Sequence, residues 1–138
     1  MGDSSKWADA TSPSLEDFEN LAAASWDNLP EHFRRVCKNV LIRVEDFATD
    51  EVLRELDIDD PLDLMGLYQG VSLDMQSVSD LPRQPEMVFL YRRAILDYWA
   101  DSNETLGHLI THVLVHEIGH HLGLSDDDMY GIEAAART

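Results

Sequence analysis

Hydrophobic residues along the chain follow two spacings, one typical of helices and the other of strands. Apolar residues recur at helical spacing after Ser14, which predicts a helix there, and they are frequent from Leu106 to Leu122, where we predict a long helix that starts at about residue 102. Short runs rich in β-branched and aromatic residues, bounded by polar residues, predict strands. The predicted strands cover residues 39–47, 64–73 and 87–91, the second with a bulge or turn at its glycines, and residues 74–85 are expected to form a loop. Shorter predicted helices cover residues 30–36, 49–56, 94–99 and 127–136.

Candidate caps mark the ends of the predicted helices. Ser14 and Thr49 each precede a helix, and their side chains can accept a hydrogen bond from one of its free N–H groups. Asp101 and Glu104 have the spacing of a capping box for the long helix, and Gly123 is placed to end it. The long helix is apolar around most of its circumference, so we expect it to be buried.

Length and cysteine content limit the architecture. Residues 1–13 are small, polar and acidic apart from Trp7, and we expect a flexible tail there, with residues 14–138 forming a single domain. A domain of this length buries enough surface to fold without disulfides. Cys37 is the one cysteine, which excludes a disulfide within the chain and a thiolate zinc cluster. We expect Cys37 to be a small core residue.

The charge of the chain excludes two classes of partner. It carries 27 acidic and 10 basic residues, a formal net charge of −17, and is therefore repelled by nucleic acids and by anionic membranes. No segment approaches the ~18 apolar residues of a membrane span, and no signal peptide is evident. We therefore expect a soluble, cytoplasmic protein, and a monomer. The acidic stretch over residues 45–63 lacks EF-hand spacing and is expected to form a solvated face.

The end of the long predicted helix carries the residues with the clearest chemistry. His116 and His120 are four residues apart, so both imidazoles lie on one face of a helix and can reach one cation. Glu117 lies beside that face, where it can accept a proton from a metal-bound water. Gly123 lets the chain turn back, so that Asp126 can supply a third ligand. Three protein ligands leave one position open, the arrangement of a catalytic zinc site.

The extended motif His116-Glu117-x-x-His120-x-x-Gly123-x-x-Asp126 resembles the zinc motif of the zincin metallopeptidases, in the variant whose third ligand is Asp. From about residue 15 to residue 131 the chain resembles a family of small bacterial proteins described as zinc metallopeptidases with a minimal zincin, or matrix-metalloprotease-like, domain. The resemblance also includes Leu29-Pro30-x-x-Phe33, residues 40–45, Leu67-Tyr68-x-Gly70-Val71, residues 89–93 and residues 113–115.

This resemblance implies zinc bound by His116, His120 and Asp126, with Glu117 as the general base. It also implies an α+β fold, in which a small mixed sheet packs on a long buried active-site helix with flanking helices. The function it favours is a zinc-dependent peptidase acting on a peptide or protein substrate, which an edge strand, residues 67–73 or 87–91, would align. The alternatives are a non-catalytic metal-binding interaction module that retains the motif, and a structural motif that binds no metal. The sequence does not define the substrate or separate zinc from other divalent transition metals.

Four further histidines lie outside the predicted ligand set. His108 and His112 continue the four-residue spacing but drift off the metal face by about 40° per step, so we expect them to pack on the helix surface. His112 is also a candidate for an oxyanion contact or a second metal site. His121 is expected to be a buried structural residue, and His32 a surface residue.

Residues near Asp126 carry weaker signals. Asp127 or Asp128 is expected to cap the last helix, the alternative being a hydrogen bond to a ligand imidazole. Tyr130 is expected in the core, the alternative being stabilisation of a tetrahedral intermediate. Gly119 lies inside the long helix, where it suggests close packing against another element.

Overall fold

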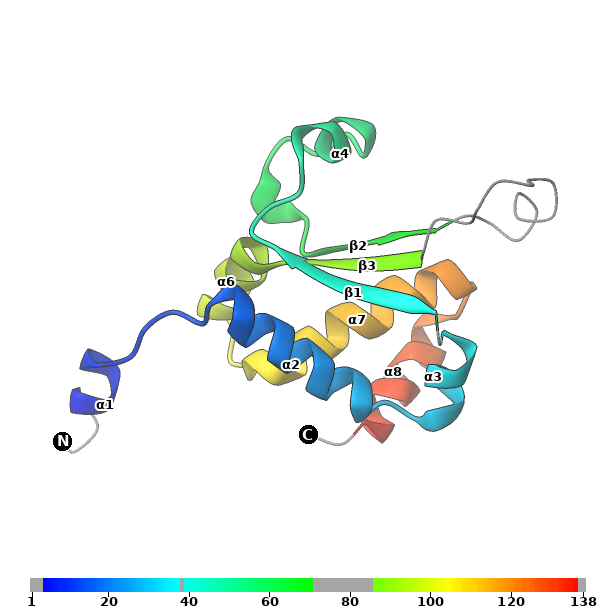
Figure 1. Cartoon of the computed structure of the whole chain (residues 1–138), viewed down its shortest axis with the longest axis horizontal. Coiled ribbons are helices and arrows are strands. Elements are labelled where there is room, and N and C mark those ends of the chain that lie inside the picture. Colours follow the sequence, from blue (N-terminus) through cyan, green and yellow to red (C-terminus); the bar gives the residue numbers. More distant parts are fainter. Residues whose placement is uncertain (1–3, 38, 71–85, 137–138) are drawn as a thin grey trace.

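A three-stranded sheet covers helices α2 (Leu15–Asp27) and α7 (Leu106–Leu122) in the computed structural model of the chain (Figure 1). The structure describes residues 4–37, 39–70 and 86–136. This arrangement confirms the expected α+β fold, with the long helix under a small mixed sheet. The other elements are α1 (Ser4–Ala8), α3 (Glu31–Val36), α4 (Asp50–Glu55), the 3-10 helix η1 (Pro61–Asp63), α6 (Arg92–Ala100) and α8 (Asp126–Ala135).

The strand order of the sheet is β1 (Val40–Glu45), β3 (Glu86–Tyr91), β2 (Gly66–Gln69). β1 is parallel to β3, and β2 is antiparallel to it. β3 therefore lies in the middle, and the expectation that residues 87–91 could be an edge strand is wrong. β2 is an edge of the sheet, and it contacts α7. Residues 71–73 of the second predicted strand, and the predicted loop over 74–85, lie outside the described residues.

Alternate residues of the strands face two different hydrophobic clusters. Ile42, Val88 and Leu90 point to the helices and belong to the main core, where Val88 and Leu90 are fully buried. Phe89 and Tyr91 point to the other side, where they meet a smaller cluster around Ala48, Leu53 and Ala94. This two-residue alternation is the period of a strand, and it explains why the short run around residue 89 is apolar throughout.

Helix α7 supplies much of the main core, as its apolar circumference predicts. Leu109, Ile110, Leu114, Val115 and Ile118 are each at most 1% exposed. The helix begins later than expected, because Thr105 is its N-cap and accepts a hydrogen bond from the His108 N–H at 3.2 Å. The capping box of Asp101 and Glu104 is wrong, since Asp101 instead ends the preceding helix, α6.

The other predicted ends are mostly confirmed. Ser14 forms a reciprocal capping box with Asp17, and Thr49 caps α4. α8 is capped by Ser125, so neither Asp127 nor Asp128 is the cap; Asp128 completes the capping box from the third helical position. An aspartate inside the first turn favours the helix dipole without being the cap residue.

The described part of the N-terminal segment contains one short helix, α1, which the sequence analysis did not predict. The end of the segment, beyond α1, is bound by Arg92. The guanidinium of Arg92 donates to the Pro13 carbonyl at 2.6 Å and to the Ser12 hydroxyl at 3.0 Å. The flexibility of residues 1–13 and the single-domain division stay predictions.

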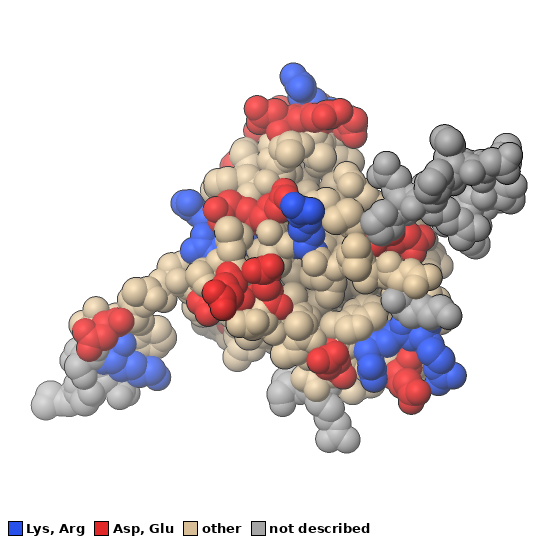
Figure 2. All heavy atoms as spheres, in the orientation of Figure 1, with Lys and Arg blue, Asp and Glu red and all other residues tan. Residues whose placement is uncertain are grey.

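The exposure of the acidic stretch and the burial of Cys37 agree with what the composition predicts. The acidic residues on α4 and in the turn after it are exposed, at the top of the molecule in Figure 2. Cys37 is 4% exposed, as expected of a core residue, and burial raises the pKa of its thiol to about 11. Within the described ranges, no helix is long and apolar enough to cross a membrane.

Replacing Gly119 by alanine is expected to destabilise the chain, because a Cβ there would collide with the Sδ and Cγ atoms of Met129 in α8. Overpacking a core costs about 1–3 kcal/mol, which outweighs the ~1 kcal/mol by which alanine is favoured over glycine in a helix. Urea unfolding measures the difference in free energy of unfolding.

The matched control is Gly107→Ala in the same helix, where an added Cβ meets no described atom within 4 Å. That change is expected to stabilise the chain by about 0.4–1 kcal/mol. Equal stabilisation by both substitutions would show that Met129 of α8 does not pack closely against Gly119.

Candidate metal centre and active site

The last turns of α7 and the first residue of α8 bring three potential metal ligands together. One ligand atom from each of His116, His120 and Asp126 lies within 4.8 Å of the others. The turn between the helices makes this possible. Gly123 adopts a left-handed conformation with a φ of 76°, and the Leu124 N–H donates to the Gly119 carbonyl at 2.9 Å.

The group lies at the surface of the protein. His120 and Asp126 are exposed, whereas the side chain of His116 is 14% exposed. The three residues predicted from the sequence therefore converge as expected, and an ion or water can reach them. Two imidazoles and a carboxylate are ligands that zinc accepts in proteins, and three ligands leave a coordination position for water or substrate. The residues present thus fit a zinc ion.

Glu117 lies under the edge of the sheet, partly buried. Its Cγ atom is 3.1 Å from the point where a Cβ on Gly66 of β2 would stand, so the bare backbone of that glycine leaves room for the Glu117 side chain. Burial raises the pKa of the Glu117 carboxyl, and the nearby His120 partly offsets the rise. A carboxylate whose pKa is raised toward neutrality accepts protons more readily, which suits a general base.

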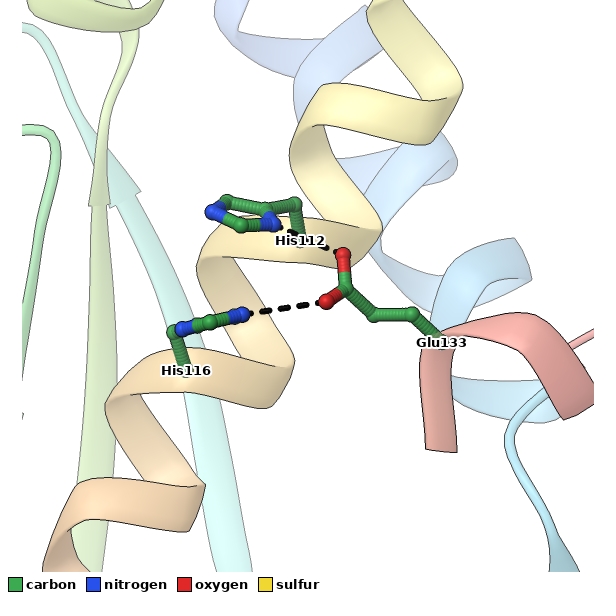
Figure 3. A group of neighbouring side chains, drawn as sticks. All are labelled: His112, His116 and Glu133. Atoms are coloured by element: carbon green, nitrogen blue, oxygen red, sulfur yellow. Dashed lines mark hydrogen bonds and ion pairs between the residues drawn. The ribbon is translucent and has the colours of Figure 1, made fainter. Parts of the chain in front are cut away.

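Glu133 of α8 is a part of this site that the sequence analysis missed. Its carboxylate lies between two histidines of α7, as Figure 3 shows: Oε1 is 2.7 Å from His112 Nδ1, and Oε2 is 3.0 Å from His116 Nε2. The spacing of Asp126, Tyr130 and Glu133 gives the one available signal, because positions i, i+4 and i+7 share a face of a helix. That face of α8 lies against the histidine face of α7.

The remaining histidines have different surroundings. His108 lies on the helix surface, as expected, with its Nδ1 3.1 Å from Glu104 Oε1. His32 is exposed, also as expected. His121 is not the buried residue that was predicted: it is exposed, and its ring stacks on Tyr68 at a centroid distance of 3.9 Å. The surface of β2 gives this ring a partner that sequence spacing does not reveal.

Tyr130 also departs from its predicted place. The residue is 56% exposed, so the expectation that it lies in the core is wrong. Its ring centroid is 5.5 Å from that of His116, at the edge of the candidate site. Met129, one residue earlier, fills the core position instead and is fully buried.

Comparison with known proteins agrees with this geometry. The family model for zincin-like metallopeptidases matches residues 37–136, which include the three strands and helices α7 and α8. No curated protein matches the chain. The family match supports a metallopeptidase-type function and implies a bound metal, typically zinc. With a minimal mixed sheet over its histidine-bearing helix, the chain belongs to the zincin-like metallopeptidase family.

Proposed function

We propose that the chain is a zinc-dependent peptidase that uses His116, His120 and Asp126 as metal ligands and Glu117 as general base. One observation carries the proposal: the three ligand atoms lie within 4.8 Å of one another, in a segment where the next residue after His116 is a partly buried glutamate. Metal binding alone does not require a glutamate next to two helical histidines, whereas a general base does require one.

Each residue has a separate task in the reaction. A zinc ion held by His116, His120 and Asp126 would act as a Lewis acid, lowering the pKa of water and polarising the peptide carbonyl. Glu117 takes the proton from the attacking water and then hands it to the leaving amine. The sheet edge above Glu117 limits the access of bulk water to this carboxylate.

The substrate in this proposal is an extended peptide aligned on β2. Among the described strands β2 is an edge of the sheet, and the backbone N–H and C=O groups of an edge strand can pair with a further strand. Gly66, the first residue of β2, is close to Glu117, which places the start of this edge beside the general base. The net charge of −17 favours peptides with basic residues, and we propose that a monomer acts on them.

Glu117→Gln is expected to abolish hydrolysis while zinc binding remains, because the amide keeps the shape of the side chain but cannot take a proton. General acid–base catalysis contributes about 10²–10⁴-fold, so the rate on a fluorescence-quenched peptide library should fall by that factor. Zinc content is measured on the same samples by mass spectrometry.

If the variant and the unaltered protein share a low rate, or none, and bind zinc equally well, the result favours the non-catalytic interaction module over the peptidase. If clear hydrolysis persists in the variant, Glu117 is not the base.

The double variant His116→Ala/His120→Ala is expected to lose the zinc that the unaltered protein holds at one ion per chain. Protein purified without an affinity tag is analysed for metal by mass spectrometry before and after dialysis against zinc. Only a stoichiometric ion that disappears with the histidines supports the site. An unaltered protein that takes up no zinc would contradict the peptidase proposal and favour a motif with a purely structural role.

A further inference from the structure

Glu133 has a buried carboxylate to which the proposed peptidase reaction assigns no task. Its side chain is 8% exposed, and both of its oxygens face histidine nitrogens (Figure 3). A carboxylate in such a place needs strong partners, because burial of an unpaired charge is costly. An ionised carboxylate can only accept hydrogen bonds, so in that state His112 Nδ1 and His116 Nε2 both donate to Glu133.

The space between the two imidazoles and the carboxylate also suits a metal cation. One ligand atom each from His112, His116 and Glu133 lies within 4.8 Å of the other two. His112 and His116 are one helical turn apart on α7, and their ring centroids are 4.0 Å apart. Two imidazoles and one carboxylate with open positions form a ligand set that binds several divalent transition metals.

The two helices that carry this group are held firmly against each other. Met129 of α8 is fully buried, and it approaches Gly119 so closely that a Cβ there would collide with it. Glu133 is one turn beyond Met129 on the same helix, so its carboxylate has little freedom to leave the histidines. The group is therefore preorganised rather than a chance meeting of flexible surface residues.

We propose that His112, His116 and Glu133 form a second metal position, which shares His116 with the position formed by His116, His120 and Asp126. A neutral imidazole has one nitrogen with a free lone pair, so His116 binds one ion at a time. The chain thus holds a single ion in either of two places. An ion held by Glu133 withdraws His116 from the first position, which gives the protein a metal-loaded form without a complete catalytic ligand set.

The test uses a chain from which the first position has been removed. His120→Ala/Asp126→Ala changes two exposed residues and leaves the second position complete. We expect this variant to bind one zinc ion per chain in equilibrium dialysis against zinc alone. Adding Glu133→Gln or His112→Ala should raise the zinc dissociation constant at least ~10-fold, because each change removes one of three ligands.

The matched control adds Glu104→Gln to the same double variant. Glu104 also pairs with a histidine of α7, His108, at 3.1 Å, but the two belong to neither three-ligand group. Zinc affinity is expected to be unchanged in this control. Circular dichroism verifies that every variant is folded, and an anomalous difference map of the zinc-soaked double variant locates the ion.

Three results would overturn the second position: no zinc uptake by the double variant, uptake that is insensitive to Glu133→Gln, or an ion away from His112. The first of these would leave Glu133 as a residue that merely orients His116. None of them touches the proposed peptidase, whose ligands His120 and Asp126 are absent from this background. If a triple variant is unfolded, the anomalous map of the folded double variant decides the question.

Discussion

The contact between α7 and α8 determines where nearly all of the chemical groups lie. Met129 rests on the bare backbone of Gly119, and Gly123 reverses the chain with a left-handed conformation between them. As a result α8 folds back along the histidine face of α7 instead of continuing away from it. Asp126 at the start of α8 reaches His116 and His120, and Glu133 further along reaches His112 and His116. A larger residue at 119 would move both carboxylates at once.

The sheet contributes to the other side of the same helix. β2 approaches α7 at Gly66, where the missing side chain makes room for Glu117 and Val113. Partial burial under this strand is what raises the pKa of the Glu117 carboxyl. The acidic character of the whole chain has little part in this shift, since desolvation is the largest cause. The proposed general base and the candidate substrate edge thus both depend on one close approach between a strand and a helix.

His116 is the residue on which the two candidate metal groups depend. Its side chain is 14% exposed, against 35% for His112. It lies 3.0 Å from Glu133 near the end of α8, and within 4.8 Å of a ligand atom of Asp126 at the start of that helix. Its imidazole packs against His112 on one side and lies near the Tyr130 ring on another. A side chain so enclosed has few orientations, so the proposed competition between Asp126 and Glu133 for one imidazole would follow from the packing.

The local elements of this protein were largely determined by the sequence itself. Ser14 and Thr49 cap helices, Gly123 ends α7, and the motif from His116 to Asp126 brings its candidate ligands together, because each of these depends on residues a few positions apart. A helix boundary is predicted wrongly where two local signals compete. Asp101 could cap the start of one helix or the end of another, and it is the C-cap of α6, directly after Ala100.

Tertiary structure alone decided the features that need distant partners. The central place of β3, the stacking of His121 on Tyr68 and the exposure of Tyr130 all depend on which surfaces meet. Glu133 shows the limit most clearly, since it is 17 residues from His116 and 21 from His112 in the sequence. The period of α8 identifies the face that carries Glu133, but only the packing of α8 on α7 aims that face at the histidines. Hydrogen bonds and metal ligands act over a few ångströms, and folding alone brings such distant residues within that range.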